Sequence, residues 1–318
     1  MTVSTCHACT SPNSVHLLSA DGGNLSVERC LSCGFVYLAS WQRSLEKFGE
    51  LYDYYARLSE EDLARRYSPE NRTRQRELLE TLAGYTRGRK LLDVGCGEGQ
   101  LLETAKNEGW DSVGLDLSET AIRLCRQRGL SASQTDFFDS SLDRQRFDAV
   151  IMSELLEHVP SPGRFLKRAE ELLEENGILY LTTPNFGSLA RRTLGGAWSV
   201  IHAEHIGYFE RTTLRQMASE QTGLREIRIE ANNITPSTFV AWFRRRGAQS
   251  VEAAATVHRK ARRSLDQQLR SAVHQSRVLG ASKKLANRAI SRAGLGDTLV
   301  AWLQKPANPT ARGAGAGF

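Results

Sequence analysis

The stretch that decides the fold is Lys90-Leu-Leu-Asp-Val-Gly-Cys-Gly-Glu-Gly99, and a helical pattern from Leu101 to Glu108 follows it. Its short apolar beginning predicts a buried strand. Glycines between a strand and a helix let the backbone approach a ligand closely, and the N-terminus of a helix favours the anionic part of that ligand. The segment therefore predicts a strand, a ligand-binding loop and a helix in succession.

An acidic residue follows this glycine loop at a spacing that is typical of nucleoside-binding folds. Asp116 ends the next predicted strand, 112–116, about 20 residues beyond the loop, where a carboxylate can accept hydrogen bonds from both hydroxyls of a ribose. The loop lacks the G-x-G-x-x-G spacing of a pyrophosphate site. It also carries Asp93 and Glu98, and this acidity favours a ligand with a cationic part over a diphosphate.

Strands and helices alternate along most of the remaining chain. The predicted strands are 90–94, 112–116, 131–135, 147–152, 177–183, 224–229 and 297–303. Strands that are separated by amphipathic helices form mostly parallel sheets with helices on both faces. The chain is therefore predicted to have an α/β fold.

Several blocks fall in order within this pattern. They are Leu92-Asp-Val-Gly-Cys-Gly-Glu-Gly99, Gly114-Leu-Asp-Leu-Ser118, Phe147-Asp148, Glu157-His-Val-Pro160 and Gly177-Ile-Leu-Tyr-Leu-Thr-Thr-Pro-Asn185. Together they resemble the class I S-adenosylmethionine-dependent methyltransferases, in particular the branch with the ubiquinone-pathway O-methyltransferases. The resemblance runs from about Arg72 to Gln304. It implies a Rossmann-like seven-stranded methyltransferase sheet and S-adenosylmethionine as cofactor.

The resemblance also implies roles for individual residues. Gly95 and Gly97 would pass under the methionine part of the cofactor, and Asp93 would lie near its ammonium. Asp116 would hold the ribose hydroxyls. The remaining implied contacts are Asp136 and Phe137 with the adenine, Ser153 with the same pocket, and Arg74 with the cofactor carboxylate. For Asp136 and Ser153 the alternative is an ordinary turn residue, because both residue types favour turns.

The N-terminal segment contains two Cys-x-x-Cys pairs. Cys6 and Cys9 are separated by 20 residues from Cys30 and Cys33, close to the spacing of four-cysteine zinc sites. Four thiolates make a closed tetrahedral site, so the predicted zinc is structural. The alternatives are four reduced thiols or a redox pair. The segment also resembles the cysteine-rich N-termini of some bacterial methyltransferases, including deoxysugar C-methyltransferases.

The methyl acceptor is predicted to lie near Trp198-Ser-Val-Ile-His-Ala-Glu-His-Ile-Gly-Tyr-Phe209, which resembles a His-x-x-Tyr-Phe segment of the family. An oxygen nucleophile benefits from a base that titrates near neutral pH, which favours histidine. His205 is therefore predicted to be the base or an acceptor contact, with His202 as the second choice; packing roles are the alternative. His158 is predicted to be structural. Thr182-Thr-Pro-Asn185 differs from the motif that grips an exocyclic amine, which argues against methylation of a nucleic-acid base.

A basic segment separates the last two predicted strands. From Arg244 to Arg292 there are thirteen Lys and Arg residues against Glu252 and Asp266, and there are no aromatic residues. Such a helical insertion could bind a phosphate-bearing acceptor, a membrane surface or RNA, or it could be a solvated face. Because stacking on bases needs aromatic side chains, RNA is the less favoured partner.

The composition, with 40% apolar and 25% charged residues among 318, is that of a globular protein of about two domains. No transmembrane run or secretory signal is evident, and a cytoplasmic location is predicted. The predicted layout is a zinc module (1–40), a helical lid or linker (41–88), a methyltransferase domain (89–235 with 294–305), a basic helical insertion (236–293) and a disordered tail (306–318).

Three functions follow from these features. The favoured one is methyl transfer to an oxygen or carbon of a small molecule, such as a metabolite, sugar or lipid-linked glycan. An RNA methyltransferase that grips phosphates through the zinc module and the insertion is the alternative. A scaffold without catalysis is the third, and the intact set of Gly95, Gly97 and Asp116 argues against it.

Overall fold

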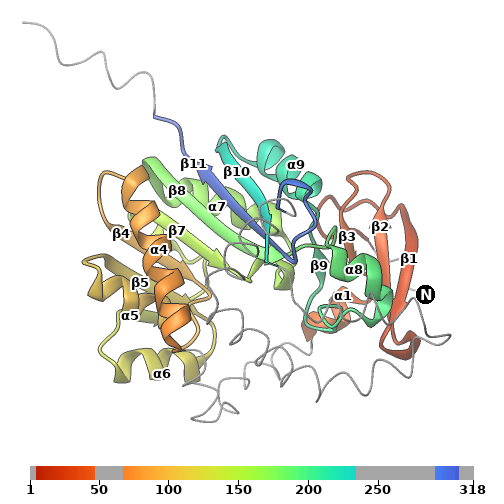
Figure 1. The fold of residues 1–318 in the computed structure, drawn as a ribbon, viewed down its shortest axis with the longest axis horizontal. Coiled ribbons are helices and arrows are strands. Elements are labelled where there is room, and N and C mark those ends of the chain that lie inside the picture. The colour runs from red at the N-terminus through yellow and green to blue at the C-terminus, as the bar shows by residue number, and fades with distance from the viewer. Residues whose placement is uncertain (1–4, 47–66, 234–290, 308–318) are drawn as a thin grey trace, which may run out of the picture.

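The structure is a computed structural model that describes residues 5–46, 67–233 and 291–307 (Figure 1). The central element is a seven-stranded mixed sheet, ordered β10-β11-β8-β7-β4-β5-β6. The strands are β4 (Lys90–Val94), β5 (Asp111–Asp116), β6 (Ala132–Gln134), β7 (Phe147–Ser153), β8 (Leu173–Pro184), β10 (Arg225–Asn232) and β11 (Thr298–Gln304). Strands β6, β5, β4, β7 and β8 run parallel, whereas β11 is antiparallel to both β8 and β10.

Helices cover both faces of this sheet, as the sequence pattern predicts. They are α4 (Pro69–Tyr85), α5 (Gln100–Asn107), α6 (Glu119–Gln127), α7 (Pro162–Leu172) and α9 (Arg211–Gln221). Successive residues of a strand point to opposite faces. Leu91 therefore packs with α4 and α5, whereas Leu92 packs in a separate cluster with α7 and α9.

A second sheet has the strand order β1-β2-β3-β9 and is antiparallel. Its strands are β1 (Ser14–Ala20), β2 (Leu25–Cys30), β3 (Val36–Leu38) and β9 (Gly207–Tyr208). The first three belong to the cysteine-rich segment, but β9 comes from the predicted acceptor segment, more than 160 residues later. Val36 pairs with Tyr208 and Tyr37 with Gly207, so the acceptor segment supplies the edge strand of the cysteine-rich sheet. The sequence did not predict this pairing.

Two further helices complete the described fold, α1 (Trp41–Glu46) and α8 (Leu189–Leu194). The predicted helical segment 41–88 is present as α1 and α4, and residues 47–66 between them lie outside the described residues. Most of the predicted basic insertion and of the predicted tail also lies outside them. None of the described helices is long and apolar enough to cross a membrane.

Candidate functional site

The predicted cofactor residues share the carboxyl edge of the parallel strands. The chain runs from β4 through β5 to β6 on one side, and then returns to place β7 and β8 on the other side of β4. Ligands of open α/β sheets bind at such a reversal, outside the carboxyl ends of the strands. The ends of β4, β5, β6 and β7 bring Gly95, Asp116, Asp136 and Ser153 to this edge.

The glycine loop has a backbone that few other residues can adopt. Gly95, Gly97 and Gly99 all have positive φ angles, of 76°, 53° and 82°. A Cβ atom on Gly99 would lie 2.7 Å from both the Cys125 Sγ and a Leu130 methyl group. Glycine is therefore required here both by conformation and by space.

The Asp116 carboxylate holds the loop against β5. The backbone N–H of Gly97 donates to its Oδ2 at 2.9 Å, and the N–H of Ser118 donates to its Oδ1 at 2.8 Å. A carboxylate has about four lone-pair sites, so each oxygen can still accept a further hydrogen bond. Asp116 is only partly buried, and its geometry fits a ligand with two adjacent hydroxyls.

Three carboxylates give the loop a strongly negative character. Asp93 is 4% exposed, and burial, together with the charges of Asp116 and Glu98, raises its pKa to about 7. Burial also raises the pKa of Asp116. A buried carboxylate with a raised pKa is stabilised by a cation that binds beside it. This observation fits the ammonium and sulfonium of S-adenosylmethionine.

The predicted adenine residues lie on the turn after β6. Asp136 is exposed, and its Oδ1 accepts a hydrogen bond from the Phe138 N–H at 2.7 Å. Phe137 is buried and stacks on Phe165 of α7, with ring centroids 5.6 Å apart. Ser153 is exposed at the end of β7. The Asp136 turn is thus anchored by an aromatic contact and presents a carboxylate outward.

Arg74 is exposed on α4 and has no hydrogen bond or ion pair among the described residues. The neighbouring side chain, Gln75, contacts the start of α5 instead, through the Gln100 amide oxygen at 3.0 Å. The cofactor contact of Arg74 stays a prediction.

Two residues that were not predicted fix the glycine loop from outside. The Tyr67 hydroxyl and the Arg128 guanidinium both donate to the Glu98 carbonyl, at 2.9 and 3.1 Å. The guanidinium also lies 4.2 Å from the centre of the Tyr67 ring. Their contacts are made to a backbone carbonyl, so no sequence motif identifies them.

The acceptor-side histidines form one cluster. The rings of His202 and His205 lie 3.9 Å apart, and those of His158 and His205 lie 4.7 Å apart. Nδ1 of His205 donates to the Val200 carbonyl at 2.8 Å, which leaves Nε2 as the acceptor nitrogen. Nδ1 of His158 lies 2.9 Å from the Glu204 carbonyl.

Burial and the neighbouring histidines lower the pKa of His205 to about 2. The imidazole is therefore neutral, and its low basicity favours a hydrogen-bonding contact over a general base. Glu157 is buried beside the cluster and receives a hydrogen bond from Thr183 at 2.9 Å. Ligand atoms of Glu157, His158 and His205 lie within 4.8 Å of one another, close enough to share a metal ion.

The four cysteines of the N-terminal segment converge on one point. The Sγ atoms of Cys6 and Cys33 lie 3.7 Å apart and those of Cys9 and Cys30 lie 3.5 Å apart, and all four lie within 4.8 Å of one another. Tetrahedral zinc with bonds of about 2.3 Å places its sulfur ligands about 3.8 Å apart. The separations are too long for disulfides, and the donor set fits zinc.

Asn185, directly after β8, is buried, and its side chain bonds to the backbone of the protein. Its amide nitrogen donates to the carbonyls of Gly294 and Gly296, at 3.0 and 2.7 Å. The residue therefore ties β8 to the chain that leads into β11, and its role is structural.

Comparison with known families decides the family of this chain. Residues 52–228, more than half of the sequence, match a family model described as a methyltransferase domain. The chain belongs to this methyltransferase family. The resemblance to class I methyltransferases, the seven-stranded sheet and the four-cysteine cluster are all confirmed.

Individual relatives of the methyltransferase domain are distant. The chain is 31% identical over 137 residues to the ubiquinone biosynthesis O-methyltransferase of Pasteurella multocida, which covers 37% of this chain and 54% of the relative. The same enzyme of Methylococcus capsulatus is 39% identical over 105 residues, which covers 31% and 44%. The chain thus spans about half the length of the curated relatives it matches.

Among the solved structures similar to this chain is an S-adenosylmethionine-dependent methyltransferase from Archaeoglobus fulgidus. It has a TM-score of 0.47 and 23% identity, over 74% of this chain and 94% of that one.

Proposed function

We propose that this protein is an S-adenosylmethionine-dependent methyltransferase that transfers a methyl group to an oxygen or carbon of a small-molecule acceptor. The observation that carries the proposal is the presence of two carboxylates, Asp93 and Asp116, at the glycine loop. One carboxylate is buried with its pKa raised to about 7, and the other offers lone pairs at the end of β5. A cationic amino-acid part and a ribose in one ligand satisfy both.

When bound, S-adenosylmethionine supplies an activated methyl group on a sulfonium. The residues of this chain would position it: Asp93 beside the ammonium, Gly95 and Gly97 under the methionine part, and Asp116 at the ribose. Asp136 and Phe137 would meet the adenine, and Ser153 and Arg74 would complete the pocket. Positioning of this kind supplies much of the catalysis for an in-line displacement.

The acceptor is proposed to bind beside the histidine cluster, which follows β8 at the same edge of the sheet. The neutral His205 is proposed to accept a hydrogen bond from an acceptor hydroxyl through Nε2, with His202 next to it. The ubiquinone biosynthesis O-methyltransferases among the relatives support an O-methylated small molecule. A sugar or a lipid-linked glycan belongs to the same acceptor class.

Zinc is proposed for the four-cysteine cluster, where it would fix the small antiparallel sheet. That sheet has few strands and a small core, so metal binding would supply much of its folding energy. Because β9 belongs to the sheet, the zinc would also hold the segment that carries His205.

The test is methyl transfer from methyl-labelled S-adenosylmethionine to separate pools of phenols, sugars, lipid-linked glycans and RNA. The proposal predicts label in a small-molecule pool with the wild type and none with Asp116→Ala. Label that enters only RNA would overturn the acceptor assignment. Failure of the zinc-loaded wild type to bind the cofactor would overturn the proposed activity itself.

A further inference from the structure

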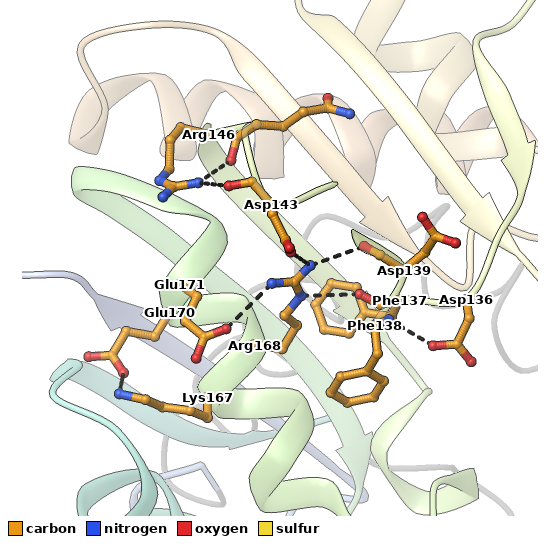
Figure 2. Close-up of polar contacts among 11 residues, drawn as sticks. Asp136, Phe137, Phe138, Asp139, Asp143, Arg146, Lys167, Arg168, Glu170 and Glu171 are labelled. Carbon is orange, nitrogen blue, oxygen red and sulfur yellow. Dashed lines mark hydrogen bonds and ion pairs between the residues drawn. The ribbon is translucent and has the colours of Figure 1, made fainter. Parts of the chain in front are cut away.

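Arg168 of α7 contacts the backbone of the proposed adenine turn (Figure 2). Its Nε donates to the Phe137 carbonyl at 3.3 Å, and its Nη2 donates to the Asp139 carbonyl at 3.2 Å. Nη2 also pairs with the Asp143 carboxylate at 2.7 Å. One guanidinium thus contacts three residues of the segment that runs from Phe137 to Asp143.

One peptide unit, between Phe137 and Phe138, links the Arg168 guanidinium to the Asp136 carboxylate. The Phe137 carbonyl and the Phe138 N–H belong to the same planar peptide, so a bond that fixes the carbonyl also fixes the N–H. That N–H donates to Asp136 Oδ1 at 2.7 Å. The orientation of the Asp136 carboxylate therefore depends on the Arg168 guanidinium, although the two side chains belong to different elements.

Arg168 is well suited to hold this arrangement. Its side chain is only 12% exposed, whereas its ion-pair partners Asp143 and Glu171 are 56% and 51% exposed. Surface ion pairs of this kind contribute little to stability. The planar guanidinium, in contrast, holds several donors in a fixed geometry that a lysine lacks. Its contacts with the two carbonyls are therefore the ones that define the shape of the turn.

We propose that Arg168 is a positioning residue for base recognition: through the Phe137–Phe138 peptide it holds the Asp136 carboxylate where it accepts the 6-amino group of adenine. This inference rests on the proposed function, because it assigns the adenine to this turn. Asp136 Oδ1 is held by the Phe138 N–H, which leaves Oδ2 to accept the hydrogen bond from the base. A hypoxanthine base carries an acceptor at position 6 and is repelled there.

The test compares the affinities for S-adenosylhomocysteine and S-inosylhomocysteine, measured by calorimetry. The variants are Arg168→Gln, Arg168→Lys and the matched control Lys167→Gln. Lys167 is the adjacent cation on α7. Its Nζ lies 2.7 Å from a Glu170 carboxylate oxygen, and this pair does not contact the turn (Figure 2). The wild type and the control should prefer the adenine ligand by about a hundredfold, since a misplaced polar group in a hydrogen-bonding site is strongly rejected.

Arg168→Gln should reduce this preference to about tenfold or less, mainly by weakening the adenine ligand, and Arg168→Lys should restore it only in part. Adding Asp136→Ala to Arg168→Gln should reduce the preference by less than it does in the wild-type background, because the two residues act in series. If Arg168→Gln does not fold, Arg168→Lys carries the same comparison.

A purely structural role for Arg168 would weaken both ligands by the same factor and leave the preference unchanged, and that result would overturn the inference. Full additivity with Asp136→Ala would also overturn it. Failure of the folded wild type to bind either ligand is a different outcome, because it removes the proposed function rather than the role of Arg168.

Discussion

The substitution Asp93→Asn separates the stability of the loop from its function. Asp93 is buried at the end of β4, and its pKa is raised from 3.8 to about 7 by burial and by two neighbouring carboxylates. At about pH 8 the folded protein therefore carries a buried negative charge without a bound cation. Asparagine has nearly the same shape and no charge, so it relieves this cost.

The pH dependence has a definite sign. A folded-state pKa above the unfolded value means that the folded state takes up the proton first as the pH falls. The contribution of Asp93 to the free energy of unfolding should therefore rise as the pH is lowered from about 8 to about 5. The buried histidines, such as His205, have lowered pKa values and act in the opposite direction, so the contribution of Asp93 is read from the difference between the wild type and Asp93→Asn. Between about pH 5 and the pKa of about 7 there are about two units, each worth about 1.4 kcal/mol, so this one group contributes about 3 kcal/mol.

The assay is urea denaturation of the ligand-free protein at both pH values, for the wild type and for Asp93→Asn. The free energy of unfolding of Asp93→Asn minus that of the wild type should be larger at about pH 8 than at about pH 5, by about 3 kcal/mol. It should nevertheless bind S-adenosylhomocysteine far more weakly, because the ligand ammonium loses its partner. A variant that is less stable than the wild type at about pH 8, or a difference that does not change with pH, would refute the reasoning.

Three further predictions concern other parts of the site. Gly99→Ala should lower the free energy of unfolding by about 2–4 kcal/mol, because it forces a Cβ atom to within 2.7 Å of Cys125 and Leu130 at a positive φ. Gly84→Ala, in open space on α4, should raise the free energy of unfolding by up to about 1 kcal/mol. Equal effects of the two substitutions in urea denaturation would contradict this explanation. Removal of the proposed zinc by a chelator, or Cys30→Ser, should speed amide hydrogen exchange at Ile206–Tyr208 together with β3, because β3 and β9 are paired. Exchange that changes only in residues 6–33 would show that the units are independent. His205→Ala removes the proposed hydrogen-bond acceptor, so it should lower turnover of an identified acceptor by about tenfold or more and leave the affinity for S-adenosylhomocysteine within about twofold. His16→Ala, on exposed β1, should change neither; a matching loss of cofactor affinity in His205→Ala would place His205 in the cofactor pocket instead.

The sequence was sufficient to predict the sheet because its signals are local. The apolar run before Gly95, the acidic end of β5 and the capping Ser118 each specify an element within a few residues. Both Cys-x-x-Cys pairs also predicted a single cluster, because four thiols at that spacing have few other uses. Element boundaries in the structure differ from the predicted ones by a few residues, as at β10, where strand pairing with β11 extends the strand to Asn232.

The features that were not predicted depend on contacts between distant segments. Strand β9 has only two residues, and no local pattern indicates that it pairs with β3. Arg128 and Arg168 act on backbone carbonyls, which every residue possesses, so neither can be recognised from a motif. The low pKa of His205 likewise follows from burial among other histidines, which only the packed structure reveals.

The central claim is that the acidic glycine loop binds S-adenosylmethionine, and calorimetric titration with S-adenosylhomocysteine tests it most directly. The comparison should use the wild type, Asp116→Ala and Asp111→Ala, because Asp111 and Asp116 are the two ends of β5 and only the second contacts the loop. The account predicts micromolar binding for the wild type and for Asp111→Ala, with a loss of about a hundredfold or more for Asp116→Ala. Equal affinities for all three proteins, or no binding by the folded wild type, would contradict it.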